Sequence, residues 1–178
     1  MDQQFVHFLK HPDPENFLAL RNALLAQRGF DPYSTELRGV DSLLQEKRSA
    51  EAESVLRSAM SPNHLISPGA HLRLSIAYQQ LGREEEAQRE RAIGMRCLEG
   101  ILSTGDGTSA HPFLVTRTSD EYDIVLAQGQ RFAQQSLIRD GTRHLDRITT
   151  ESEVEYYFDV TDIFQLAKGK LGRGAVKM

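Results

Sequence analysis

Side chains that could do chemistry gather at a short segment with two glycines, Gly105-Asp106-Gly107-Thr108. Asp106 and His111 lie in this same short segment, and a carboxylate beside an imidazole is a common acid–base pair. The amides of such a loop can hold an anion, and Asp106 can hold a cation. The same composition is typical of a structural hinge, because glycine adopts the backbone angles of a sharp reversal. We favour the hinge, since the alternating acids of a calcium loop are absent.

A second group of acids lies further along the chain: Glu121, Asp123, Glu153, Glu155 and Asp159. Two of them that converged on a sheet would form a paired carboxylate site. Acids in the first turn of a helix or on the exposed face of a strand are ordinarily solvated, so we favour solvated acids here. The sequence thus supports no catalytic residue. Asp106, His111 and Asp159 are kept as candidate binding residues at the junction between the two halves of the chain.

Other chemistries have no motif in this sequence. There is no nucleophile elbow, phosphate-binding loop or dinucleotide fingerprint. His7 and His11 are four residues apart, but no third ligand or Cys-x-x-Cys pair accompanies them as a zinc site would need, and the single cysteine, Cys97, excludes an internal disulfide. We therefore expect no metal and no cofactor.

Charge and hydropathy exclude two classes of partner. The net charge is −4, and the aromatic residues of the clearest strand stand beside acids, so we expect no nucleic acid partner. No stretch approaches the roughly 20 apolar residues of a membrane span, and the first residues lack the features of a signal peptide. We expect a cytoplasmic protein that binds no membrane.

Residues 1–104 are predicted to be helical, because apolar residues recur there at helical spacing. Residues that typically start a helix precede the predicted elements: Asp2, Asp13-Pro14, Ser34, Ser49 and Ser67-Pro68. Gly29 and Gly82 are predicted to end the second and the fifth helix. A sixth helix is predicted over residues 83–102.

A repeat is visible within this half. The pattern from Leu43 to Ala59 recurs from Tyr78 to Gly94, offset by 35 residues. Its turn glycine and small helix-packing residues resemble the tetratricopeptide repeat. A peptide-binding groove generally needs about three repeats. A six-helix bundle of helical hairpins that docks on the sheet is therefore favoured over such a groove.

Residues 105–170 are predicted to form a small α/β half. We expect a buried strand over 113–116, and a helix over 119–128, for which a strand is the alternative. Strands near 134–139 and 143–149, joined by Asp140-Gly141, precede a strand over 153–160 and a last helix that ends at Gly169. Residues 171–178 are predicted to be a flexible tail.

The predicted fold is therefore α+β, with tetratricopeptide-like helical hairpins followed by a small, mainly antiparallel sheet with one or two helices. The two halves either share one composite core or form two domains on a loose hinge.

Several short motifs together resemble the uncharacterised bacterial family catalogued as domain of unknown function 4919. They are Ile101-Leu102 with Gly105-Asp106-Gly107-Thr108, Pro112-Phe113 with Val115, Glu121-Tyr122, Gln135-Ser136-Leu137 and Tyr156-Tyr157-Phe158-Asp159-Val160. The resemblance covers roughly residues 70–168. It implies no activity and no functional residue, because the family has no established activity.

The leading hypothesis is a non-enzymatic protein–protein interaction or scaffold module whose partner is another protein or a peptide. It predicts an exposed apolar or mixed groove on the helical half. The alternative is a small hydrolase or ligand-binding protein with a pocket at the junction near Asp106, His111 and Asp159. The oligomeric state stays open.

Overall fold

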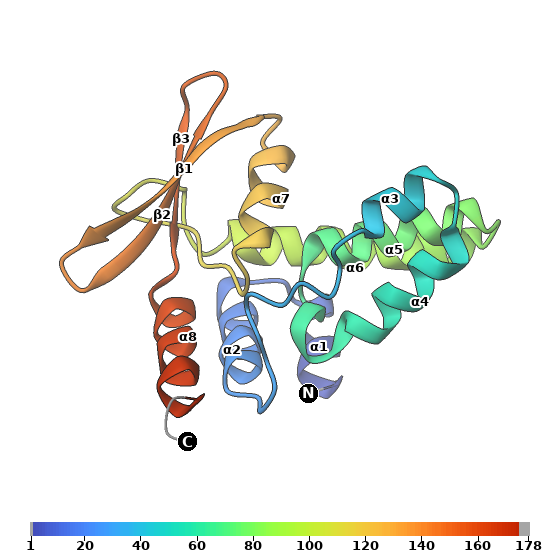
Figure 1. Ribbon diagram of the computed structural model, residues 1–178, viewed down its shortest axis with the longest axis horizontal. Helices are drawn as coiled ribbons and strands as arrows, with labels where there is room; N and C mark the ends of the chain where they lie inside the picture. The colour runs from blue at the N-terminus through green and yellow to red at the C-terminus, as the bar shows by residue number, and fades with distance from the viewer. Residues whose placement is uncertain (1, 175–178) are drawn as a thin grey trace. The chain divides into compact units, whose positions relative to one another are not determined.

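The computed structural model describes residues 2–174 of the chain and the side chains of residues 3–168. It divides into two compact units, Met1–Glu99 and Gly100–Met178, which we describe separately. Within the described part, eight α-helices and a short π-helical turn accompany one three-stranded antiparallel sheet (Figure 1). The predicted α+β class is confirmed.

The first unit is helical. Its elements are α1 (Asp2–Lys10), α2 (Pro14–Leu25), α3 (Val40–Gln45), α4 (Ser49–Ala59), the π-helical turn η1 (Met60–His64), α5 (Pro68–Gln80) and α6 (Glu84–Leu102), of which the last continues into the second unit. The carboxylate of Asp13 accepts a hydrogen bond from the amide of Asn16 at 2.9 Å. This bond satisfies a free amide of the first turn of α2, and it explains why Asp13-Pro14 begins a helix.

Two helix boundaries in this unit differ from the prediction. The third helix begins at Val40 and not after Ser34, because Gly39 adopts a left-handed conformation with φ +86° that interrupts the helix. The Ser34 hydroxyl accepts from the amide of Glu36 in a local turn instead. Gly29 is left-handed as predicted, but α2 already ends at Leu25.

One hydrophobic cluster of the first unit lies between α3, α4, α5 and α6. Its buried residues are Val40, Leu44, Ala52, Leu56, Leu74, Ala77, Tyr78 and Ala87. At Gly94 of α6, an added Cβ would lie 3.1 Å from the Leu72 side chain, so the absence of a side chain permits close helix packing. The tetratricopeptide-like character of these hairpins stays a prediction.

The second unit begins in the last turn of α6. It contains α7 (Ser119–Ala127), β1 (Phe132–Asp140), β2 (Arg143–Thr150), β3 (Glu155–Asp159) and α8 (Thr161–Gly174). The predicted helix over 119–128 and the three predicted strands are confirmed. The strands form an antiparallel meander in the order β1-β2-β3, and α7 packs against β1.

Three local predictions in this unit were wrong. Residues 113–116 form no strand: Phe113 alone makes a parallel bridge to Phe158 of β3. The β1–β2 turn is centred on Gly141 and Thr142, since Asp140 still pairs with Arg143. The helix α8 continues past Gly169 to Gly174. Of the predicted tail, residues 171–174 therefore belong to α8, and residues 175–178 lie outside the described residues.

Candidate functional site

Two of the three candidate binding residues lie together in an exposed loop. The Asp106 carboxylate accepts from the amide of Thr108 at 2.9 Å, and its second oxygen lies 3.8 Å from Nδ1 of His111. Hydrogen bonds from Thr108, aided by the nearby His111, lower the pKa of Asp106. Both side chains are exposed, Asp106 by 61% and His111 by 75%. Asp159 has a different role, because its carboxylate accepts from the amide of Thr161 at the first residue of α8.

The backbone of this loop bonds to itself. The amides of Asp106 and Gly107 both donate to the carbonyl of His111, at 3.0 and 3.1 Å. An added Cβ at Gly105 would lie 2.4 Å from that same carbonyl oxygen. Because these amides already have an acceptor, they are not presented to an anion. The loop geometry therefore favours the structural role.

The expectation that the acids are solvated was wrong for Glu121. Its side chain has no exposed surface, whereas Glu153 and Glu155 are exposed. Asp146 of β2 is also buried, with 7% exposed. Sequence reasoning missed Asp146 altogether. The signal available in the sequence was its place two residues before Ile148 in the predicted strand 143–149, which puts both side chains on the same face.

Four side chains from α7, β1 and β2 form what we call the carboxyl cluster: Glu121, Tyr122, Gln135 and Asp146. The side-chain amide of Gln135 donates to Oε2 of Glu121 at 3.0 Å and to Oδ2 of Asp146 at 2.9 Å. Its carbonyl oxygen accepts from the Tyr122 hydroxyl at 2.6 Å. One amide thus joins two buried acids, and the tyrosine fixes its orientation.

Burial governs the electrostatics of the carboxyl cluster. Burial raises the pKa of Glu121 well above its ordinary value, and the neighbouring Asp146 carboxyl raises it further. Burial also raises the pKa of Asp146, while hydrogen bonds from Gln135 and Glu121 act in the opposite direction. Both carboxyl groups therefore hold their protons to higher pH than solvated acids do, and the larger shift is at Glu121.

A carboxylic acid beside a carboxylate is in principle a general acid and a general base. Here both groups are almost completely buried, so a substrate has no contact with either in this conformation. The cluster links α7 to β1 and β2 through polar bonds in the interior. We assign it a structural role on this geometry.

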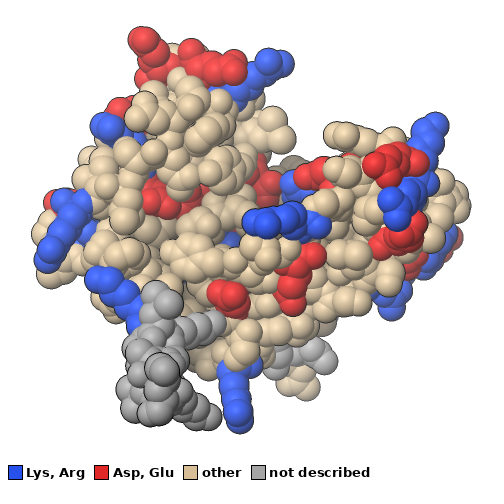
Figure 2. All heavy atoms as spheres, viewed as in Figure 1, with Lys and Arg blue, Asp and Glu red and all other residues tan. Residues whose placement is uncertain are grey.

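A pocket of about 500 Å³ lies on the helical unit, between α4, α5 and α6. Met60, Leu74 and Tyr78 give this α4–α6 groove an apolar part, and Arg57, Arg83, Glu86 and Arg89 give it charged walls. Over the helical unit, Figure 2 shows Lys or Arg side chains interspersed with Asp or Glu. The groove is therefore of mixed character.

The arginines of the groove differ in the hydrogen bonds and ion pairs that they form. Arg83 bonds to Glu53 and to Glu86, each at 2.9 Å, and its guanidinium lies 4.4 Å from the centre of the Tyr78 ring. Arg57 lies 3.5 Å from Glu53 and is 62% exposed. Arg89 is exposed and forms no hydrogen bond or ion pair among the described residues. Arg57 and Arg89 can therefore take an acidic partner at little cost.

A buried histidine lines the same groove. Nδ1 of His71 lies 2.6 Å from Oε2 of Glu90, and Nε2 lies 2.9 Å from the carbonyl oxygen of Leu65. A carbonyl only accepts, so Nε2 carries a hydrogen, and a second hydrogen must lie between Nδ1 and Glu90. No spacing in the sequence identifies this pair, because the two residues come from different helices.

Neither a metal-binding cluster nor a membrane-spanning helix is present among the described residues. No group of three or more His, Cys, Asp or Glu side chains there is arranged to hold a metal ion. None of the helices in that part of the chain has the length and apolar content to cross a membrane.

Comparison with known proteins identifies one family. The family described as Domain of unknown function (DUF4919) matches residues 70–168. Neither a curated protein nor a solved structure shows significant similarity to the chain.

Proposed function

The chain belongs to the DUF4919 family, and from this premise we propose that it is a non-enzymatic protein–protein interaction module that binds a peptide segment in the α4–α6 groove. The observation that carries the proposal is the groove itself, with about 500 Å³ of space and a mixed lining. Tyrosine, methionine and arginine, which line it, are the residues enriched at protein interfaces.

The lining suggests the chemistry of the segment. Leu74, Met60 and the ring of Tyr78 suit an apolar side chain. Arg57 and Arg89 suit an acidic side chain on either side of it, because neither is held by a short ion pair. We therefore propose a partner segment with one apolar residue flanked by acidic residues.

A phage-displayed random peptide library, panned against the purified chain, tests this proposal. We expect enrichment of peptides that combine an apolar residue with acids. The double variant Arg57→Glu and Arg89→Glu should bind a selected peptide roughly tenfold more weakly, equivalent to about 1.4 kcal/mol. Arg28→Glu with Arg91→Glu is the matched control, since both arginines are exposed and lie outside the groove lining. Equal loss in the control, or no enriched peptide, refutes the groove as the binding site.

A small hydrolase or ligand-binding protein is the second candidate, and the volume of the α4–α6 groove, about 500 Å³, supports it because small-molecule sites are of this size. Native mass spectrometry of the purified chain distinguishes the two candidates. A retained small molecule that is lost in the double variant favours ligand binding, and a ligand-free chain favours the peptide module.

A further inference from the structure

The two edge strands of the sheet, β1 and β3, differ in whether their outward backbone groups are hydrogen-bonded. At the β3 edge, the loop before α7 supplies backbone partners: the amide of Tyr157 donates to Gly107, and Phe113 both donates to Tyr157 and accepts from Asp159. These three bonds measure 2.8 to 3.0 Å. The loop thus covers this edge as a further strand would.

No segment of the described chain bonds to the β1 edge in this way. Backbone bonds join His144 to Val160 and Thr150 to Val154, so the even-numbered residues of β2 face β3. Backbone groups of neighbouring residues in a strand point to opposite sides, so the odd-numbered residues of β2 bond to β1. Their partners in the register are even-numbered residues of β1.

The backbone groups of Gln135, Leu137 and Arg139 therefore point away from β2. Among the described residues, no hydrogen bond reaches the amide or the carbonyl of any of the three. The Leu137 side chain is 53% exposed. The strand also carries neither lysine nor proline, two residues that commonly protect an open edge.

We propose that β1 pairs antiparallel with β1 of a second copy of this chain, with Leu137 opposite its own counterpart, so that two three-stranded sheets become one. This inference concerns the second unit and does not depend on the α4–α6 groove. In this register, Gln135 of each copy lies opposite Arg139 of the other. Every outward backbone group from residue 135 to residue 139 then has a partner.

The shape and charge of the strand favour a second copy. The regular part of β1 lies between an irregularity at Phe132/Gln134 and the turn after Asp140, and Leu137 is at its centre. A pairing about that centre is symmetric, as the interface of a homodimer must be. It places Arg139 opposite Gln135 and Asp140 opposite Gln134 of the other copy, so no like charges face one another. It also covers the exposed Leu137.

Sedimentation velocity over a range of protein concentrations tests the association. We expect the mass to rise from 20.1 kDa toward twice that value as the concentration increases. Leu137→Lys should leave a folded monomer, because it places two positive charges face to face on the symmetry axis. Leu126→Lys is the control: Leu126 is 70% exposed on α7, so this variant removes exposed apolar surface away from the edge and should still dimerise.

Cross-linking tests the register. Opposed residues of a bonded antiparallel pair have Cα atoms about 5.5 Å apart, within the range of a disulfide. Leu137→Cys should therefore give a disulfide-linked dimer on mild oxidation, and Cys97 does not interfere because it is buried. Arg139→Cys is the matched control. The two copies of that position would lie about 13 Å apart along the strands, so this variant should cross-link far less.

The outcomes are distinct. A mass of one chain at every concentration overturns the proposal. A dimer that persists in the Leu137→Lys variant also overturns it. So does a dimer that Leu126→Lys disrupts as strongly as Leu137→Lys does. A circular dichroism spectrum and a melting temperature of Leu137→Lys close to those of the wild type, measured where the wild type is also monomeric, show that any loss of association is not a loss of folding. Binding of peptides in the α4–α6 groove should be unaffected by Leu137→Lys, so the two proposals fail independently.

Discussion

Glu121 and Asp146 accept hydrogen bonds from the same nitrogen, Nε2 of Gln135, at 3.0 and 2.9 Å. One residue comes from the first turn of α7 and the other from the middle of β2. Both are buried, and burial raises the pKa of both. We therefore expect the stability of the second unit to depend on pH through these two carboxyl groups.

Replacing Glu121 by glutamine should alter how stability depends on pH. The pKa of Glu121 is raised in the folded chain. Its contribution to the free energy of unfolding is therefore complete below the ordinary glutamate pKa of about 4.3, and it is lost as the pH rises through the pKa of the folded chain. Glutamine stays neutral, so the advantage of Glu121→Gln over the wild type should grow with pH. Each tenfold difference in proton affinity is worth about 1.4 kcal/mol.

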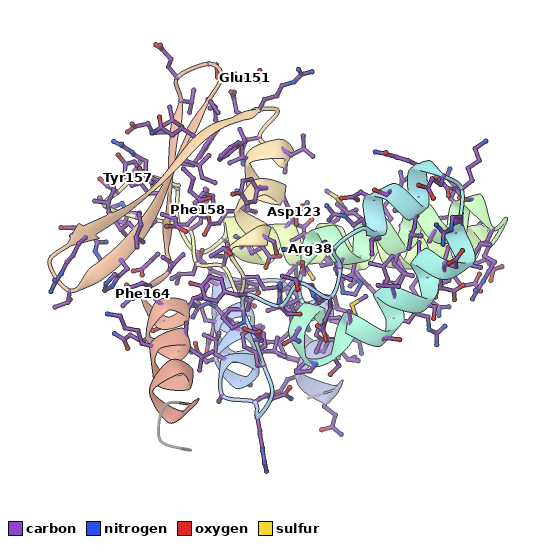
Figure 3. All side chains as sticks on the ribbon, viewed as in Figure 1. Arg38, Asp123, Glu151, Tyr157, Phe158 and Phe164 are labelled. Atoms are coloured by element: carbon purple, nitrogen blue, oxygen red, sulfur yellow. The ribbon has the colours of Figure 1, made fainter. Side chains whose placement is uncertain are left out.

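Urea midpoints at a series of pH values measure this difference. Glu151→Gln is the control, because Glu151 lies exposed just after β2 (Figure 3). Its profile should run parallel to that of the wild type. Parallel profiles for Glu121→Gln and the wild type would contradict the prediction.

Gln135→Leu should destabilise the chain by about 2–3 kcal/mol. The substitution removes the shared donor, and each buried group left without a partner costs about 1–3 kcal/mol. Gln134→Leu is the matched control, since Gln134 is the exposed neighbour on the same strand. Chemical denaturation of both variants measures the difference, and equal losses would show that Gln135 contributes no more than a surface residue.

Gly105→Ala should destabilise the chain by about 1–3 kcal/mol or more. The new methyl group would lie 2.4 Å from the carbonyl oxygen of His111 and 2.5 Å from that of Pro112. Both are backbone atoms, so the loop must shift to admit it. Gly141→Asn is the comparison, because Gly141 has open space around it and asparagine tolerates its left-handed conformation. A melting temperature that is lower for Gly141→Asn than for Gly105→Ala would refute this account.

Glu90→Ala should cost about 1–3 kcal/mol, whereas Glu90→Gln should cost less. Alanine leaves Nδ1 of the buried His71 without a partner, and glutamine can still donate to it. Nitrogen NMR of the imidazole checks the mechanism. With glutamine at this position, Nδ1 should report an acceptor while Nε2 keeps the hydrogen that it donates to Leu65. Equal destabilisation by both variants would rule out the proposed bonding.

The sequence by itself determined the elements whose causes are local. Asp13-Pro14 begins α2 because the cap bond spans only three residues. The β1–β2 hairpin lies where the turn residues Asp140-Gly141 predict it, although its centre is Gly141 and Thr142. The family is also found in the sequence, through short motifs between Ile101 and Val160 that lie within the family match over residues 70–168. In each case the information lies within one segment or in the order of segments.

Only the tertiary structure decided which polar residues are buried. Glu121 looks in the sequence like an ordinary acid that favours the start of a helix. Its burial arises from Gln135 and Asp146, which reach it only when α7 packs on the strands. The α4–α6 groove and the open edge of β1 are equally invisible in the sequence. Both depend on which surfaces remain uncovered after folding, and this is set by contacts between residues far apart in the chain.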